Sequence, residues 1–398
     1  MRAIHLSTWK EVCGISAYTN HLVNSLNSKD VDSEIYPIKR EEIQHLSLKE
    51  IRDFFKLFCE KAREFDIVHI QHEHAFFNGS YPLYKSIDIF SEMLSHLKEN
   101  NSRVIVTFHA DPIFVQKLDR NDIGELERSL RILSNAFQTW KWSTKISPFF
   151  GNASRFIAIS HTTRSRLNLL ESGFSAKSVH LVSHGVSSSL REIRESLTEL
   201  DYRSILNFSS DTKLLSIFGF ISENKGYVTA ISTLKYLPNN YKLVILGGTH
   251  PYEKKDGFLD KILELINNLE LVDRVVITGY VDFETFKLYS KATDIFLAPY
   301  LPSSLLSASG AITWALSSGK PVIASRIPAF LELNQNKRCL LLVSPESPRE
   351  LAWEILKLDE NIVLKSKLVK NSLEYAEENS WDNIAVATQD LYTKMLNT

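Results

Sequence analysis

Residues 214–226 read Leu214-Leu215-Ser216-Ile217-Phe218-Gly219-Phe220-Ile221-Ser222-Glu223-Asn224-Lys225-Gly226 and join an apolar run to a glycine-containing loop. A short apolar run bounded by such a loop is typical of a strand buried on both faces of a parallel sheet. The loop after a parallel strand lies at the carboxyl edge of the sheet, where doubly wound proteins bind their ligands. The segment therefore predicts a strand, a ligand-facing loop and a helix, in that order.

Comparable apolar runs, separated by helical stretches, recur along the chain. In the first half they cover residues 3–6, 67–71, 104–108, 156–159 and 180–183. In the second half they cover residues 214–218, 242–246, 275–278, 295–298, 321–324 and 340–343. Strands that alternate with helices predict an α/β fold built from βαβ units. We therefore expect two Rossmann-like domains, residues 1–190 and 205–378, joined by a charged stretch without strands near 190–210.

The composition fits two ordinary globular domains. The chain has 398 residues, of which 44% are hydrophobic, with 46 Lys and Arg against 47 Asp and Glu. This balance excludes a disordered chain and gives no reason to expect nucleic acid as a partner. Cys13, Cys59 and Cys339 are too few and too widely spaced for a disulfide framework or a CxxC zinc site. With no signal-peptide pattern and no apolar run of about 18 residues, we expect a cytoplasmic protein.

The loop after the first strand contains one glycine, Gly14, where a helix begins. Free amides at a helix N-terminus can bind an anion, so Gly14 is a candidate for a phosphate or sugar contact, with a plain strand-to-helix turn as the alternative. Neither GxGxxG nor GxxxxGK[ST] occurs in the sequence, which argues against an NAD enzyme and a P-loop ATPase.

Histidines follow the second and third of the expected strands. Gln71, His72 and Glu73 precede His74, a cluster that superficially suggests a metal site. The period of a strand would place His72 and His74 on one face and Glu73 on the other, and no further ligand has a recognisable spacing. Hydrogen bonding at a strand end, without metal, is the expectation. His109 follows the third strand and could meet a sugar hydroxyl or a phosphate, or serve the structure alone.

Two loops of the second half could bind an anion. Lys225 would place an ammonium beside a helix N-terminus, unless it is an ordinary solvated lysine. Ser307, Ser309 and Gly310 precede another helix and could cradle a diphosphate, although Ser and Gly caps are common without ligands.

One aromatic and basic run, residues 137–150, could lie on a bilayer interface or belong to the core. The stretch before it, residues 123–137, has amphipathic helical spacing, and we expect its apolar stripe to pack on a sheet. That stripe comprises Ile123, Leu126, Leu130, Leu133 and Phe137.

Taken together, these motifs resemble the retaining glycosyltransferases of family 4, whose GT-B fold has two facing Rossmann-like domains with a cleft between them. The resemblance covers nearly the whole chain. It rests on the Gly14 loop and on the segments 66–73, 107–109, 158–160, 183–186, 219–226, 278–281 and 319–324. Trp381 is similar to a late aromatic of the family, after which a final helix, here about 382–398, completes the N-terminal domain.

The resemblance implies a hexosyltransferase that moves a sugar, with glucose as our guess, from a UDP-sugar to a hydroxyl acceptor in polysaccharide or glycolipid biosynthesis. It implies no metal cofactor, a saccharide or lipid-linked acceptor, and contact with the inner face of the membrane as one option. The residues that it implicates as catalytic are His109 and Lys225. Donor contacts are assigned to Gly14, Gly219, Lys225, Gly279, Tyr280, Val281, Ser307, Ser309, Gly310 and Ala311. Acceptor contacts are assigned to Gln71, His72 and Glu73.

The chain departs from the family at two places. Better-known members carry paired glutamates where this sequence has Leu306 and Trp314, and a Ser-x-Ser-Gly turn resembling that of a subset of the family stands there instead. Phe220 occupies a position where many members place an arginine for the diphosphate. The missing glutamates keep open the alternative of a non-catalytic nucleotide-sugar-binding protein. A nucleotide-sugar epimerase, which shares the two-domain architecture, is the other alternative.

Overall fold

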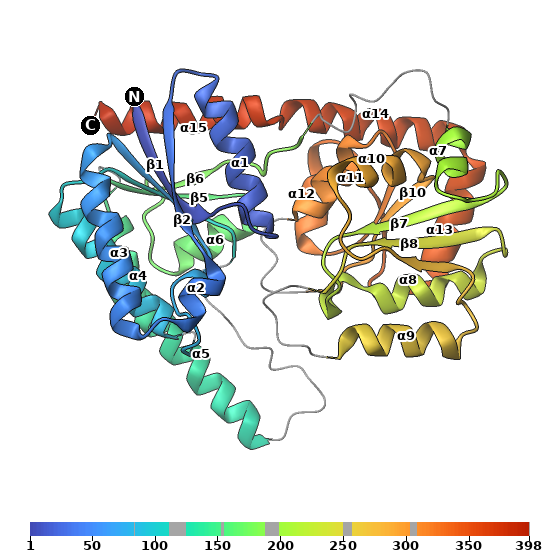
Figure 1. Cartoon of the computed structure of the whole chain (residues 1–398), viewed down its shortest axis with the longest axis horizontal. Helices are drawn as coiled ribbons and strands as arrows, with labels where there is room; N and C mark the ends of the chain where they lie inside the picture. The colour runs from blue at the N-terminus through green and yellow to red at the C-terminus, as the bar shows by residue number, and fades with distance from the viewer. Residues whose placement is uncertain are drawn as a thin grey trace. The chain divides into compact units, whose positions relative to one another are not determined.

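The computed structural model describes residues 1–82, 84–110, 125–152, 155–187, 199–249, 257–302 and 309–397. These residues form two compact units (Figure 1). The first contains residues 1–185 and 381–397, and the second contains the described residues between 186 and 380. Each unit is a layered α/β domain, as the alternation of strands and helices predicts.

The first unit is built on a parallel sheet of six strands in the order β2-β1-β3-β4-β5-β6. These are β1 (Arg2–Thr8), β2 (Asp32–Ile38), β3 (Ile67–His72), β4 (Val104–Phe108), β5 (Phe156–Ser160) and β6 (Val179–Leu181). Sequence analysis missed β2, because this edge strand alternates polar and apolar residues, contains Pro37 and has no continuous apolar run.

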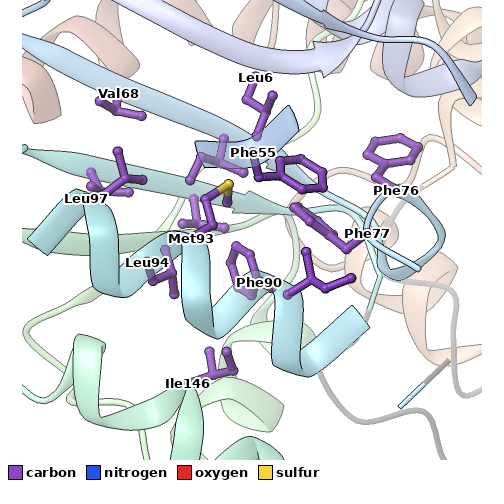
Figure 2. Packing of buried hydrophobic residues seen from close by; sticks show 14 of the residues in the cluster. Leu6, Phe55, Val68, Phe76, Phe77, Phe90, Met93, Leu94, Leu97 and Ile146 are labelled. Atoms are coloured by element: carbon purple, nitrogen blue, oxygen red, sulfur yellow. The ribbon is translucent and has the colours of Figure 1, made fainter. Parts of the chain in front are cut away.

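Side-chain alternation along the strands divides the first core into two layers. Ala3 packs with one layer and its neighbour Ile4 with the other. The layer of Ala3 is covered by α1 (Gly14–Asn27) and α15 (Trp381–Leu396), which lie against each other. The opposite layer is covered by α3 (Leu48–Lys61) and α4 (Tyr84–Glu99), and Figure 2 shows how their aromatic and aliphatic side chains fill it.

The second unit also contains a parallel sheet of six strands, in the order β12-β11-β10-β7-β8-β9. They are β7 (Lys213–Phe218), β8 (Tyr241–Leu246), β9 (Val275–Ile277), β10 (Ile295–Ala298), β11 (Val322–Ser325) and β12 (Leu341–Val343). Counted from β7 as strand 1, this is the Rossmann order 3-2-1-4-5-6. The prediction of two Rossmann-like parallel-sheet domains is therefore confirmed.

Helices flank the second sheet on both faces (Figure 1). They are α8 (Tyr227–Thr233), α9 (Phe258–Asn268), α10 (Phe283–Ala292), α11 (Gly310–Ser317), α12 (Pro328–Asn336), α13 (Pro348–Glu360) and α14 (Ile362–Glu378). A further helix, α7 (Glu199–Ile205), lies in the stretch expected to be a linker. It is part of this unit, because Tyr202 is buried in the core. Arg203 also forms an ion pair with Asp294, the residue before β10, at 2.7 Å between the guanidinium nitrogen and the carboxylate oxygen.

The helix α5 (Glu125–Lys145) corrects one expectation. The stripe expected to pack on the sheet is exposed: Leu126 is 77%, Leu130 58%, Leu133 65% and Phe137 47% accessible. Only the C-terminal part of the helix joins the core, through Trp142, and in Figure 1 the rest extends away from the sheet. Ile123 lies outside the described residues. No helix within the described ranges is both long and apolar enough to cross a bilayer.

Candidate functional site

The strand order identifies where each sheet can bind a ligand. In the second unit the order reverses between the neighbouring strands β7 and β10. In the first unit the reversal falls between β1 and β3. A crevice opens at such a switch point because the connections that leave the two strands diverge to opposite faces of the sheet. The loops after β7 and β10, and those after β1 and β3, contain most of the residues that the sequence singled out.

In the second unit, the loops after β7 and β10 are locked together by their backbones. The amide of Leu301 donates to the carbonyl of Asn224 at 2.9 Å. Gly226 adopts a left-handed conformation, with φ of 74°, and packs so closely that a Cβ there would lie 1.8 Å from the carbonyl oxygen of Pro299. Only glycine fits both the conformation and the contact. This lock fixes the position of Lys225, the residue before Gly226.

The ammonium of Lys225 lies against a buried phenol. Its Nζ donates to the hydroxyl of Tyr300 at 2.5 Å and lies 4.3 Å from the centre of the same ring. The Tyr300 hydroxyl is also 3.1 Å from Oγ of Ser309. Three polar groups from the two loops therefore meet at one point, and sequence reasoning had found Lys225 and Ser309 but not Tyr300.

Ser309 is the N-cap of α11, and its Oγ accepts from the amide of Ile312 at 3.4 Å. The amides of Gly310 and Ala311 belong to the first turn, where a helix offers no internal acceptors. Gly219 lies beside them: a Cβ there would be 3.4 Å from Nζ of Lys225 and 3.7 Å from Cβ of Ala311. The lysine charge, the helix N-terminus and a glycine that leaves room next to both are suited to an anion.

Ser307 and Leu306 lie outside the described residues, so their predicted contributions stay predictions. Trp314, at the place of a family glutamate, packs its ring with those of Phe283 and Phe286 at 5.5 and 5.8 Å. This protein therefore has an aromatic cluster where better-known members of the family have the carboxylate of a glutamate. Phe220, at the place of the family arginine, lies edge-on to the ring of Tyr280 at 5.9 Å.

The predicted base-binding residues follow β9. Gly279 has a left-handed backbone, with φ of 67°. The ring of Tyr280 is half exposed and covers Gly248, where a Cβ would come within 3.0 Å of it. The Tyr280 hydroxyl donates to the carbonyl of Thr249, and Val281 is partly buried beside it. An exposed aromatic ring held at this edge of the sheet could stack on a planar group.

In the first unit, Gly14 is exposed at the start of α1. Apart from its chain neighbours and the backbone of its own helix, no atom of the described residues lies within 4 Å of the position that a Cβ would occupy there. The fold therefore does not require glycine at this site, whereas close approach of a ligand to the backbone would.

His109 follows β4 and is held by its neighbour on β3. Its Nε2 lies 2.8 Å from Oε1 of Gln71, so that the amide oxygen accepts the ring proton. The ring of Tyr18 on α1 packs edge-on against it at 4.8 Å. His161 and His184, which follow β5 and β6, also lie around Tyr18, at 5.3 and 5.2 Å.

Burial lowers the pKa values of these imidazoles. The pKa of His109 falls well below its usual range, first because of burial and then because of the neighbouring histidines. Burial lowers the pKa of His161 to about 3 and that of His184 to about 4. These rings are therefore neutral at physiological pH and can both donate and accept hydrogen bonds. Sequence analysis gave no site role to His161, His184 or Tyr18, although His184 lies in the segment 183–186 that carries part of the family resemblance.

His72 is placed differently from its neighbours. Its ring is 1% exposed and packs among Phe77, Phe90 and Phe108 at 4.5 to 5.4 Å. The side chain of His72 therefore points into the core and is not placed to make the acceptor contact that the sequence predicts. Glu73, the next residue, is partly exposed. Across the described residues, no group of three or more His, Cys, Asp or Glu side chains is arranged to hold a metal ion.

Comparisons with known proteins find a family match within the second unit. Residues 212–361 match the family described as glycosyl transferases group 1. An uncharacterized glycosyltransferase of Methanocaldococcus jannaschii is 25% identical over 199 residues, which cover 49% of this chain and 48% of the relative. Mannosylfructose-phosphate synthase of Agrobacterium fabrum is 23% identical over 204 residues, 49% of this chain and 43% of the relative. The chain thus spans about half the length of the curated relatives it matches.

Solved structures match the whole chain. Sucrose-phosphate synthase from Thermosynechococcus elongatus has a TM-score of 0.74 at 18% identity, with complete coverage of both chains. Anabaena HepE, solved in complex with UDP and glucose, has a TM-score of 0.70 at 15% identity and covers 99% of this chain and 100% of its own. The fold is that of the GT-B glycosyltransferases, and the second unit carries a glycosyl transferases group 1 domain.

Proposed function

We propose that this protein is a glycosyltransferase that transfers a sugar from a nucleoside diphosphate donor to an acceptor hydroxyl. One observation carries the proposal: Lys225, Ser309 and the N-terminus of α11 converge at the β7 and β10 switch point of a domain that matches the group 1 family. That convergence suits the diphosphate of a nucleotide sugar, because a positive charge and several hydrogen-bond donors face the same space.

The chemistry asks this chain to stabilise a leaving group. As the bond from the anomeric carbon to the donor phosphate breaks, negative charge develops on the diphosphate. Lys225, with the amides of Gly310 and Ala311, is suited to receive this charge, since donors fixed before the reaction stabilise a transition state at little reorganisation cost. In this proposal these groups fill the role that a divalent metal fills in other transferases.

The first unit would handle the sugar and the acceptor. His109 is our candidate for a contact with the donor sugar, because Gln71 holds its ring at a strand end in a fixed orientation. Gly14 would allow the β-phosphate or the sugar to approach the backbone of α1. Glu73 and the Gln71 region would face the acceptor, whereas buried His72 would support them through the core.

The finer identity of the reaction extends this proposal. We infer UDP as the nucleotide, glucose as the sugar, retention of anomeric configuration and membership of glycosyltransferase family 4. The resemblance of the motifs supports these choices, and so does the fold of HepE, which was solved with UDP-glucose. The Gly279 to Val281 segment would hold the base, with Tyr280 as its stacking surface.

A titration of the purified protein with UDP, GDP, ADP and several UDP-sugars, first without and then with divalent metal, tests the proposal. We expect UDP and one UDP-sugar to raise the unfolding temperature without metal, because a ligand that binds only the folded state stabilises it. Transfer to an acceptor, rather than epimerised donor or unchanged donor, separates the transferase from the two alternatives. Absence of binding by all the nucleotides would refute the proposal.

The Lys225→Ala variant sharpens this test. We expect its transfer rate to fall by about two to three orders of magnitude, as loss of a charge-stabilising group typically does. Lys235→Ala removes an exposed lysine of the same unit and serves as the matched control, with unchanged activity expected. A fully active Lys225→Ala enzyme would overturn the role given to this residue.

Membrane contact is the remaining part of the proposal, with α5 as the contact element. Its exposed stripe of Leu126, Leu130, Leu133 and Phe137 is continued by Trp140, which is 59% exposed. Such a helix face can insert into the interfacial region of a bilayer. Co-sedimentation with anionic vesicles should detect the wild-type protein in the pellet and lose the Leu130→Ser and Leu133→Ser double variant. Equal sedimentation of both proteins would refute this contact.

A further inference from the structure

The proposed function gives no role to Tyr300, although its phenol lies among the residues proposed to bind the diphosphate. The side chain is 3% exposed, and its ring packs 5.2 Å from that of Phe330. Its hydroxyl contacts two of the groups proposed to bind the diphosphate, the ammonium of Lys225 and the hydroxyl of Ser309. A buried aromatic therefore connects the loop after β7 to the N-terminus of α11.

Chemistry fixes the direction of one hydrogen bond in this chain of contacts and leaves two possible directions for the other. An ammonium has no acceptor, so Lys225 must donate and the Tyr300 oxygen must accept. Between Tyr300 and Ser309, whose hydroxyl oxygens are 3.1 Å apart, either group can donate; when Tyr300 donates, its proton points to Oγ of Ser309. Oγ of Ser309 also accepts from the amide of Ile312. In the arrangement in which Tyr300 donates, Ser309 keeps its own hydroxyl proton for another acceptor.

The same contacts limit the freedom of Lys225. A lysine side chain has high rotational entropy, and ordering it when a ligand arrives reduces affinity. Here Nζ is held by the Tyr300 hydroxyl and lies 4.3 Å from the centre of the ring. An ammonium has three N–H groups, so two remain for a ligand after one is given to Tyr300.

We propose that Tyr300 is a positioning residue that directs the ammonium of Lys225 and the hydroxyl proton of Ser309 toward one anion, the diphosphate of the donor. This inference rests on the proposed function. It assigns to Tyr300 an effect on the phosphates alone, since among the described residues its hydroxyl bonds to Lys225 and Ser309, which belong to the proposed diphosphate site and not to the Tyr280 region proposed for the base.

The Tyr300→Phe variant tests the proposal, because it keeps the ring and removes only the hydroxyl. Calorimetric titration should show UDP binding weakened about 10-fold, the effect of one hydrogen bond that acts on a charged group. Uridine, which has no phosphate, should bind the variant and the wild-type protein equally. A merely structural role would weaken both ligands, so equal losses for UDP and uridine would overturn the proposal, as would unchanged UDP affinity.

Tyr241→Phe provides the matched control. Tyr241 is also a buried phenol of the second unit, and its hydroxyl donates to Asp359 at 3.1 Å. Loss of this bond should lower the unfolding temperature slightly and leave UDP affinity unchanged. A UDP loss equal to that of Tyr300→Phe would show that general loosening of the unit explains both, and would overturn the proposal.

Ser309 gives a second route that does not depend on the folding of Tyr300→Phe. We expect Ser309→Ala to weaken UDP but not uridine about 5-fold, and Ser309→Thr, which retains a hydroxyl, to restore most of the affinity. Unchanged UDP binding by Ser309→Ala would overturn the proposal. If the wild-type protein binds none of UDP, GDP and ADP, the proposed function fails. If the wild-type protein binds UDP but Tyr300→Phe and Ser309→Ala do not weaken UDP selectively, only the role of Tyr300 fails.

Discussion

Replacing Gly226 with alanine adds only one methyl group, yet we expect it to destabilise the second unit strongly. A Cβ at this position would lie 1.8 Å from the carbonyl oxygen of Pro299, so one backbone must move by more than 1 Å, as ordinary carbon-to-oxygen contacts exceed about 3 Å. The left-handed conformation costs about 1 kcal/mol. The movement would also strain the packing, for about 1–3 kcal/mol, and break the bond from Leu301 to Asn224, for about 1 kcal/mol.

Together these terms lower the free energy of unfolding of Gly226→Ala by about 3–5 kcal/mol. Gly319→Ala is the matched control variant. Gly319 has the same φ of 74°, but no described atom outside its chain neighbours lies within 4 Å of its Cβ position. It therefore isolates the cost of conformation from that of the contact. We expect the unfolding temperature to fall by about 10 °C for Gly226→Ala and by about 3 °C for Gly319→Ala.

Circular dichroism during heating measures both variants, and UDP titration adds a second readout. Gly226→Ala should lose UDP affinity because the loop that carries Lys225 is displaced, whereas Gly319→Ala should keep it. Equal destabilisation of the two variants would refute the argument, since it would show that the contact with Pro299 is relieved without cost.

The remaining predictions concern buried charge and buried imidazoles. Asp294→Ala should lower the free energy of unfolding by about 3–5 kcal/mol, because it removes the carboxylate that neutralises the buried guanidinium of Arg203 and that accepts from the Leu214 amide. Glu284→Ala breaks an ion pair of the same 2.7 Å length whose glutamate is 79% exposed, and a change above about 1 kcal/mol in urea denaturation would contradict this contrast. Burial lowers the pKa of His5 and of His161 to about 3. From about pH 6.5 downward the unfolded chain therefore binds protons that the folded chain does not, and each histidine should cost about 1.4 kcal/mol per pH unit. Urea midpoints at pH 7, 6 and 5 should fall less steeply for His161→Gln than for the wild-type protein, and parallel curves would contradict the assignment.

The strands that could be predicted are those with the simplest environment. Residues 295–298 are apolar throughout, residues 104–108 are apolar except for Thr107, and both segments are buried on both faces, so the apolar runs alone indicate β10 and β4. The strand β2 lies at the edge of the sheet, and its alternation of polar and apolar residues is also compatible with a loop. The helix α5 shows the opposite failure, because its regular apolar spacing indicates a helix but does not tell whether anything covers the stripe.

The candidate site divides in the same way. Lys225 and Ser309 could be found because glycine and serine loops after buried strands are local signals. Tyr300 carries no such signal: it follows a strand and a proline, and nothing in residues 299–301 tells that its hydroxyl meets residues 75 positions earlier and nine later. His72 and His109 look alike in sequence, yet one ring lies in an aromatic core and the other beside Gln71.

The sequence by itself determined the two α/β domains, the approximate strands and the loops that could meet an anion, because periodicity and loop chemistry act over a few residues. Tertiary structure alone decided the strand order that brings β7 beside β10, the lock between Gly226 and Pro299, and the placement of a phenol between Lys225 and Ser309. These depend on contacts between segments far apart in the chain, whose energies exist only once the sheet has assembled.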